Sequence, residues 1–368
     1  MKKSISSRKF RIQDNMLRLK PATVTAGISA PQGGFGSVVA GWFRNESANQ
    51  SSGSSEDELG YYHETVLLEE AVHFMAPSEG KVLIDGTLGG GGHTEKMLEA
   101  GAVVYGVDRD PQALEYAGKR LARFGENFKP VKGNYTDSLQ LMQQRGVNGV
   151  DGILVDLGVS SWQFDEAERG FSFSKEGPLD MRMGDEGTTA ADIVNTWDEA
   201  DMRRIFWEYG EERSARKIVS RICEHRAATP FLTTTQLAEA IEKWCPRMGK
   251  RIHPATKVFQ ALRIEVNDEL GALRGLLDTS AELLNPGGRL CVISFHSLED
   301  RMVKRFLKAT SAKEVDKKEW PTPRPNPEYY YQLASRKPVT ASTEEISRNK
   351  RSRSAIMRVG ERIESIET

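Results

Sequence analysis

The sequence predicts an α/β fold of the Rossmann-like class into which a helical domain is inserted. Short apolar runs alternate with segments of helical apolar spacing from residue 65 to residue 156, which indicates strand–helix–strand units and a parallel sheet. Three of the apolar runs end in an acid, at Asp85, Asp108 and Asp156, and glycines follow the first. This rhythm breaks between residues 169 and 251, where helical spacing continues and no strand pattern is clear.

The predicted elements follow one another at the spacing of such a sheet. Helices are predicted over residues 65–76, 93–100 and 111–124, the last with Pro111 in its first turn. Strands are predicted over residues 81–85, 102–107, 128–131 and 153–156. After the insertion, helices are expected from 255 to 284, then a turn at Pro286-Gly287-Gly288 and a buried strand over 289–295. Residues 309–335 are expected to be irregular, and a basic tail follows from Arg336.

The length of 368 residues suggests about two domains, and the formal net charge of −1 argues neither for nor against a nucleic-acid partner. We predict a disordered extension over 1–58, a discontinuous α/β domain over 59–168 and 252–362, and a helical insertion over 169–251. The three cysteines are scattered, so reduced thiols and no metal site are expected; they are Cys223, Cys245 and Cys291.

We expect a cytoplasmic protein, because no apolar run approaches the ~20 residues that span a bilayer and no secretory signal is evident. The first 45 residues are basic and hold one acid, Asp14, which leaves an organelle transit peptide as an alternative. An RNA-contacting tail is a third interpretation of this segment.

The segment from Asp85 to His93 holds a run of glycines between the first predicted strand and the next helix. Glycines let the backbone approach a ligand, and the amides of a helix N-terminus then face its negative end. The dinucleotide-binding fingerprint requires a glycine three positions after Gly91, where this chain has Thr94. An acid before the glycines is more usual in methyltransferases than in dinucleotide-binding folds, so a nicotinamide oxidoreductase is disfavoured.

Two further strand-end acids are candidate ligand-binding residues. Asp108 ends the second predicted strand, about twenty residues on from the end of the first, where a carboxylate suits hydrogen bonds to ribose hydroxyls. Asp110, directly before Pro111, is the better helix cap. Asp156 ends the fourth strand, where active sites of open parallel sheets lie, although a cap or turn role is equally open for it.

The run from Asp156 to Gln163 resembles the ribosomal small-subunit methyltransferase H family, whose bacterial members methylate cytosine N4 in 16S rRNA. Further matching segments occur in the order and spacing of the family, at residues 63–68, 85–93, 107–112, 168–173, 177–183, 209–212, 253–256, 294–301 and 349–355. The resemblance covers residues 61 to 360 and leaves out the first 58.

The resemblance implies a class I methyltransferase that transfers a methyl group from S-adenosylmethionine to the N4 amine of a cytosine in the decoding region of 16S rRNA. By position, the implied cofactor-binding residues are Gly91, Gly92 and His93 for the methionine end, Asp108 for the ribose, Tyr135 beside the adenine, and Asp156 and Gln163. One departure is Gly90, where the family often has a larger residue.

A cytosine amine is a poor nucleophile, and enzymes that act on such amines hold its hydrogens with acceptors. Asp156 and the carbonyls that follow it are candidate acceptors, although the Pro-Pro-aromatic motif of many amino-methyltransferases is absent there. His296, after the late strand, is a second catalytic candidate, and a structural role for it is equally open. The missing prolines disfavour an amino-methyltransferase for DNA or protein, and the intact acids disfavour a non-catalytic binding module.

The implied partner is 16S rRNA, as free RNA or within the small subunit, and a second copy of the chain is a further candidate. The insertion offers basic residues for an RNA clamp, although a solvated helix face is the commoner reason for such a run: Arg203, Arg204, Arg213, Arg216, Lys217 and Arg221. In the tail, a second basic cluster faces few nearby acids in the sequence: Arg348, Lys350, Arg351, Arg353 and Arg358.

Overall fold

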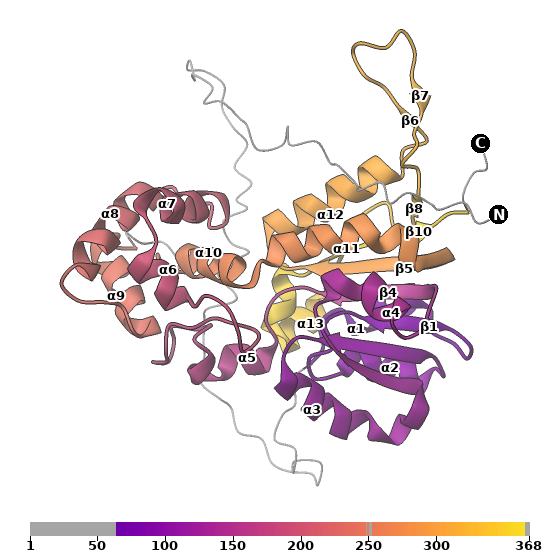
Figure 1. The fold of residues 1–368 in the computed structure, drawn as a ribbon, viewed down its shortest axis with the longest axis horizontal. Coiled ribbons are helices and arrows are strands. Elements are labelled where there is room, and N and C mark those ends of the chain that lie inside the picture. Colours follow the sequence, from indigo (N-terminus) through magenta and orange to yellow (C-terminus); the bar gives the residue numbers. More distant parts are fainter. Residues whose placement is uncertain (1–63, 248, 250–251, 365–368) are drawn as a thin grey trace. The chain divides into compact units, whose positions relative to one another are not determined.

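The computed structural model describes residues 64–247, 249 and 252–364, and the expected disorder of residues 1–58 lies outside this part of the chain. The sheet at its centre has the strand order β3-β2-β1-β4-β5-β10-β8, and β9 also pairs with β10 (Figure 1). Its five parallel strands are β1 Val82–Asp85, β2 Val103–Asp108, β3 Phe128–Lys132, β4 Val150–Asp156 and β5 Leu284–Ser294. All four strands predicted before the insertion are therefore confirmed, and the late strand is confirmed with an earlier start.

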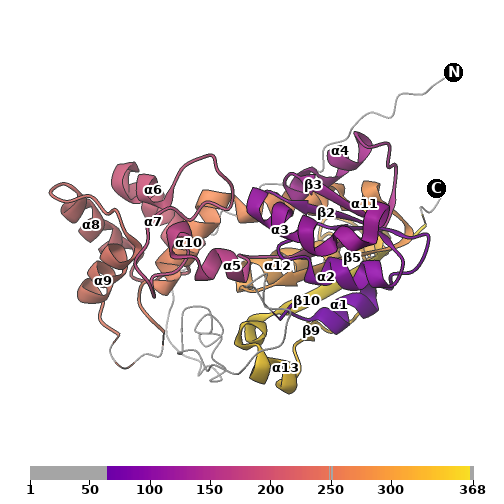
Figure 2. The same ribbon diagram turned by 90° about the horizontal axis from the view of Figure 1, so that it is seen from below.

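The parallel strands are apolar along most of their length because helices cover the sheet. Ile153, Leu154 and Val155 of β4 are completely buried, as expected for a central strand with both faces covered. One group of covering helices contains α1 Leu68–Met75, α2 Gly92–Glu99 and α3 Pro111–Leu121. A second group contains α11 Glu269–Leu283, which contacts both α4 Ser138–Gln143 and α12 Ser297–Thr310 (Figure 2).

The described residues between 169 and 251 contain helices, as the sequence predicts, and no strand is assigned to them. The helices are α6 Ala190–Thr196, α7 Glu199–Glu208, α8 Ala215–Arg226 and α9 Thr234–Trp244. Their apolar faces share a cluster whose largest members include Phe206 and Phe231. The helix α10, Thr256–Asn267, adds Phe259 and Leu262 to that cluster, so it packs with the insertion although it follows the predicted boundary.

The part of the chain after α12 differs from the prediction. Residues 309–335 are not wholly irregular, because they contain β6 Glu314–Val315, β7 Arg324–Pro325 and β8 Tyr331–Leu333. Tyr331 is completely buried, and its hydroxyl donates a 2.7 Å hydrogen bond to the Ser280 hydroxyl. The predicted turn at Pro286-Gly287-Gly288 lies within β5, where the pairing with β4 shifts in register between Val150 and Gly152.

The basic tail is also part of the fold. It contains β9 Val339–Thr340, α13 Thr343–Arg348, a 3-10 helix over Lys350–Ser354, and β10 Ile356–Arg362. β10 runs antiparallel to β5, with Ile356 opposite Ser294, and so covers an edge of the parallel sheet. Within the described ranges, no helix is both long enough and apolar enough to pass through a bilayer.

Candidate active site

A pocket lies at the carboxyl ends of the parallel strands. Because β1, β2 and β4 run in the same direction, the acids that end them meet at this edge of the sheet. Of the sequence-predicted site residues, those that line the pocket are Gly92, His93, Asp108, Tyr135, Asp156 and Gln163. Gly91 and His296 do not line it.

The glycine loop joins β1 to α2, as predicted. Gly91 precedes α2 in the left-handed conformation, with φ of 79°, and a Cβ on it would lie 2.9 Å from Cδ1 of Leu121. Gly91 is therefore needed for the turn and for close packing on α3, and not for contact with the pocket. The His93 ring contacts the Val66 carbonyl through Nε2 at 3.1 Å, and burial lowers the pKa of His93 to about 4, so the ring is neutral at pH 7.

The acid that precedes the glycines stabilises the loop through hydrogen bonds to residues on both sides of the glycines. Asp85 is buried and does not line the pocket. Its Oδ2 accepts a hydrogen bond from the Thr94 hydroxyl at 2.7 Å, and its Oδ1 accepts one from the Thr87 amide at 3.2 Å. Burial raises the pKa of Asp85 to about 6, although both hydrogen bonds act against this shift.

Asp108, at the end of β2, both lines the pocket and tethers the loop. Its Oδ2 accepts the Gly89 amide at 2.8 Å, and its Oδ1 accepts the Asp110 amide at 2.9 Å. Burial raises the pKa of Asp108 to about 6. Asp110 is the cap of α3 that the sequence predicts, since its side chain accepts the Gln112 amide.

Gln163 belongs to the short helix α5, Ser161–Asp165, and its polar atoms are engaged within the protein. Its Nε2 donates to Oδ2 of Asp110 at 2.8 Å, and its Oε1 accepts the Ser160 amide at 3.1 Å. Arg169 lies 3.0 Å from the same Asp110 oxygen. The structure thus shows Gln163 holding α5 to the start of α3, while its contact with a cofactor stays a prediction.

Tyr135 follows β3 and begins a short 3-10 helix, Tyr135–Asp137. A Cβ on Gly86 would lie 2.9 Å from Cβ of Tyr135, so the glycine after β1 leaves room for this residue. The Tyr135 hydroxyl lies 3.5 Å from the carbonyl oxygen of Glu269. Burial raises the pKa of Tyr135, so the phenol keeps its proton.

Asp156 presents an oxygen that the protein does not satisfy. Its Oδ1 is buried and has no hydrogen-bond partner in the described part of the chain. The backbone amide of Asp156 donates to the Thr87 hydroxyl at 2.7 Å, which fixes the end of β4 against the glycine loop. Burial and the charges of Asp85 and Glu299 raise the pKa of Asp156 well above its ordinary value. A buried polar atom without a partner is costly and points to a ligand.

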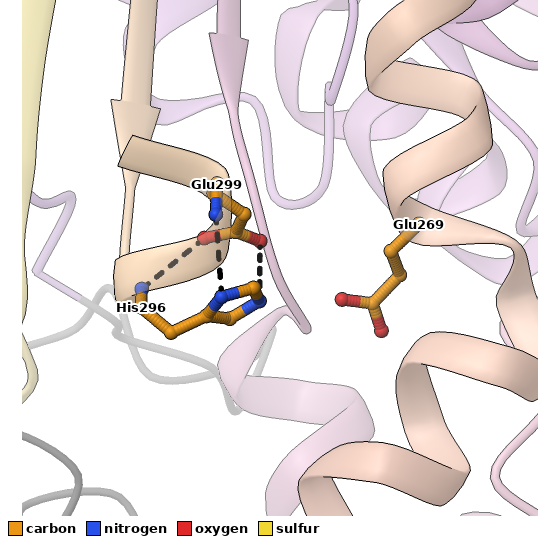
Figure 3. Close-up of side chains that lie close together, drawn as sticks. All are labelled: Glu269, His296 and Glu299. Atoms are coloured by element: carbon orange, nitrogen blue, oxygen red, sulfur yellow. Dashed lines mark hydrogen bonds and ion pairs between the residues drawn. The ribbon is translucent and has the colours of Figure 1, made fainter. Parts of the chain in front are cut away.

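His296 caps α12 and does not face the pocket. Its Nδ1 accepts the Glu299 amide at 3.4 Å, while Oε2 of Glu299 accepts the amides of Phe295 at 2.8 Å and His296 at 3.2 Å (Figure 3). Glu299, which sequence reasoning missed, lines the pocket in place of His296. An acid three residues after a helix cap is the signature of this arrangement and could have revealed it.

The charge state of Glu299 follows from its neighbours. Burial disfavours its charge, but His296 and Arg263 outweigh burial, so the pKa of Glu299 is lower than its ordinary value. Nε2 of His296 lies 3.1 Å from Oε1 of Glu299, yet this nitrogen is buried and makes no well-aligned hydrogen bond among the described residues.

Glu269, His296 and Glu299 offer ligand atoms that lie within 4.8 Å of one another, a donor set that could hold a cation (Figure 3). Glu269, however, pairs both carboxylate oxygens with Arg263, at 2.7 and 2.8 Å. Glu299 already receives two backbone amides. Because both carboxylates have protein partners, these contacts do not assign a metal to the cluster.

Several of the basic residues expected to contact phosphate form ion pairs with acids that lie far from them in the sequence. Arg358 binds Asp300 at 2.6 Å, Arg351 binds Asp165 at 2.9 Å, and Arg348 lies 3.1 Å from Glu64. The expectation that few acids face the tail is therefore wrong, because these partners come from distant parts of the chain. Lys350 and Arg353 of the tail are exposed, as are all six basic residues named for the insertion. Of those six, Arg204 and Arg221 have acidic partners.

The chain matches the model of the MraW methylase family over residues 60–363. The ribosomal RNA small subunit methyltransferase H of Deinococcus deserti is 50% identical over 82% of this chain and 93% of its own length. The protein of the same name from Anaeromyxobacter sp. is 48% identical over 82% of this chain and 98% of its own. Among solved structures, an rRNA methylase from Streptococcus thermophilus is 11% identical, with a TM-score of 0.35, over 81% of this chain and 94% of its own. The chain belongs to the MraW methylase family and is an S-adenosylmethionine-dependent methyltransferase.

Proposed function

We propose that this protein methylates the exocyclic N4 amine of a cytosine in the decoding region of small-subunit ribosomal RNA. Relatives at about half identity bear the name of a small-subunit rRNA methyltransferase, and they cover most of the chain. The observation that carries the proposal is Asp156 at the carboxyl end of β4, which lines the pocket and whose buried Oδ1 has no hydrogen-bond partner in the part of the chain that the structure describes.

The pocket residues suit S-adenosylmethionine. Gly89 and Gly90 line the pocket, and a Cβ on either would come no closer than 3.8 Å to another atom, so the loop surface is open to a ligand. Gly92 and His93 would hold the methionine end at the start of α2, and Asp108 would accept hydrogen bonds from the ribose hydroxyls. Tyr135 would pack beside the adenine. When bound, this group supplies a methyl carbon activated by a positively charged sulfur.

The protein must align the cytosine amine with the methyl carbon, and the amine must lose a proton. Positioning of two reactants in a site is worth several kcal/mol. An ionised Asp156 would accept a hydrogen from the amine, and the positive charge of the bound sulfonium favours the ionised form. As nitrogen gains the methyl group it loses one proton, and a carboxylate of raised pKa is a better acceptor for it than an ordinary aspartate.

The RNA would reach this pocket only after the target base leaves its stack, at a cost of a few kcal/mol. We propose that the helical insertion, residues 169–251, recognises the RNA, supported by its exposed Arg203, Arg213 and Arg216. The small subunit as the physiological substrate and a homodimer are further parts of the proposal. The relatives named above are bacterial, which supports the cytoplasm as the site of action, and none supports the organelle alternative.

Incubation of the protein with labelled S-adenosylmethionine tests the function. Small subunits, naked 16S rRNA, DNA and bulk protein are offered separately, and nucleosides from the labelled RNA are identified by mass spectrometry. We expect N4-methylcytidine from small-subunit RNA. Label in DNA or protein alone would instead support an amino-methyltransferase of another substrate class.

A further inference from the structure

We propose that Asp156 and Glu299 form a subsite for a primary aromatic amine, in which two carboxylates accept its two hydrogens and exclude a carbonyl at the same position. This subsite would select cytosine over uracil. The inference rests on the proposed function, which it deepens by assigning base discrimination to a residue pair.

The fold brings these two carboxylates to the same edge of the sheet. β4 and β5 are parallel neighbours, with Asp156 opposite Ile293, so their carboxyl ends coincide. The helix α12 begins at Ser297, directly after β5, and Glu299 lies in its first turn. Both side chains line the same pocket, and the charge of Glu299 contributes to the raised pKa of Asp156.

Each carboxylate keeps acceptor capacity that its contacts with the described residues do not exhaust. Oδ1 of Asp156 is buried and has no hydrogen-bond partner in the described ranges. In Glu299, Oε2 accepts two backbone amides, whereas the polar contact of Oε1 in the described residues is with Nε2 of His296, at 3.1 Å. A carboxylate oxygen has two lone pairs, and the contact with Nε2 of His296 takes one of them at most, so Oε1 retains a lone pair for a ligand (Figure 3).

His296 acts on this subsite as a positioning residue. Its side chain is only 5% exposed, and it fixes Glu299 through the reciprocal contacts of the helix cap. Its Nδ1 accepts the Glu299 amide at 3.4 Å and its Nε2 lies 3.1 Å from Oε1 of Glu299, so both ring nitrogens face Glu299. The cap therefore holds Glu299 in place without consuming both of its oxygens.

Glu269 has a third carboxylate in the pocket, but its own contacts exclude it from the amine subsite. Both of its oxygens accept hydrogen bonds from the Arg263 guanidinium, which also neutralises its charge. Glu269 is thus a matched control: it is acidic, buried and lines the same pocket, but it has no free acceptor of comparable strength.

The chemistry of the two bases explains the selection. The N4 amine of cytosine donates two hydrogens, and carboxylates are its usual protein acceptors. Uracil carries a carbonyl oxygen at that position. This oxygen would face the carboxylates of Asp156 and Glu299, and none of the three groups would supply a hydrogen for a hydrogen bond. A site built for an N–H donor rejects an analogue without one far more strongly than an apolar pocket rejects a missing methylene.

The test uses the full chain with sinefungin, an analogue that cannot transfer a methyl group and whose positively charged amine stands in place of the sulfonium methyl, so that Asp156 faces the same charge. Two RNAs differ only in cytosine or uridine at the position that mass spectrometry identifies as methylated. We expect wild type to bind the cytosine RNA about 100-fold more tightly. Glu299→Gln and Asp156→Asn each provide an amide N–H that can meet the carbonyl, and each should lower this ratio by about 10-fold or more, as one lost bidentate contact would. Glu269→Gln should keep the wild-type ratio.

Thermal unfolding and S-adenosylmethionine affinity of each variant show that it is folded. If Glu299→Gln fails to fold, Asp156→Asn decides, because Oδ1 of Asp156 makes no structural hydrogen bond in the described residues. A wild-type ratio in folded Glu299→Gln or Asp156→Asn, or an equal loss in Glu269→Gln, would overturn the subsite while wild type still methylates cytosine. Absence of cytosine methylation by wild type would instead overturn the proposed function.

Discussion

The Thr94 hydroxyl donates a 2.7 Å hydrogen bond to the buried carboxylate of Asp85. These are the two residues by which the sequence departs from a dinucleotide-binding loop, and the structure joins them into one interaction. Thr94 lies in the first turn of α2 and Asp85 ends β1, so the bond closes the loop at its base. The acid before the glycines therefore orders the loop and does not contact the pocket.

Thr94→Val keeps the shape of the side chain and removes the donor to Asp85. We expect a loss of about 1–3 kcal/mol in the free energy of unfolding, because a buried acceptor is left unsatisfied. Urea denaturation measures it. Thr94→Ser, which keeps the hydroxyl, should recover most of the loss, and equal stability of the Val and Ser variants would contradict the role of the bond.

The pH dependence of stability should reveal the ionisation of Asp85. Its pKa is raised from 3.8 to about 6 in the folded protein, so between these pH values the unfolded chain loses this proton while the folded chain keeps it. The contribution of Asp85 to the free energy of unfolding is therefore largest below pH 3.8. It falls as the pH rises toward 6, by up to about 3 kcal/mol. The difference in unfolding free energy between wild type and Asp85→Asn, measured from pH 4 to pH 7.5, isolates this contribution. A difference independent of pH would contradict it.

Adjacent glycines of the loop should respond in opposite ways to substitution by alanine. A Cβ on Gly90 would meet only the Tyr116 ring, at 3.8 Å, so Gly90→Ala should be neutral or stabilise the fold by about 0.4–1 kcal/mol. A Cβ on Gly92 would lie 1.9 Å from the Thr65 hydroxyl, so Gly92→Ala should destabilise by about 1–3 kcal/mol. Thermal unfolding compares the two, and equal melting temperatures would be inconsistent with the observed packing.

Removal of the Asp108 carboxylate should weaken S-adenosylmethionine binding by about 10- to 100-fold, the value of one charged hydrogen bond. The side chain also tethers Gly89, so part of the loss would come from a looser loop. Isothermal titration of Asp108→Ala provides the affinity, and Asp137→Ala, at an exposed acid near the same edge, is the control. Unchanged affinity in Asp108→Ala would remove Asp108 from the site.

Two arginines of the tail should separate RNA binding from stability. Arg358 of β10 pairs with Asp300 of α12 and is 17% exposed, so Arg358→Ala should lower stability and leave the salt dependence of RNA binding unchanged. Arg353 is exposed, and Arg353→Ala should reduce the slope of log affinity against log salt by about one. Binding titrations at several salt concentrations test both. The same slope in Arg353→Ala and wild type would place the RNA elsewhere.

Local patterns account for the parts of the fold and site that the sequence predicted. Strands, helices and the cap at Asp110 depend on neighbouring residues, so periodicity and turn chemistry reveal them. The meeting of Asp108 and Asp156 at one edge also follows from sequence, because parallel strands place their carboxyl ends together. The motif resemblance then identified the family, which the comparisons confirm.

Contacts between distant segments decided the rest. β10 pairs with β5, although more than sixty residues separate the paired positions in the sequence, and no local sequence pattern predicts that pairing. The same holds for the Arg358–Asp300 pair and for the packing of Gly91 on Leu121. At the start of α12, the direction of the helix turns Glu299 into the pocket and His296 into the cap. The sequence determines which chemical groups are present, whereas the partner of each group depends on its position in the tertiary structure.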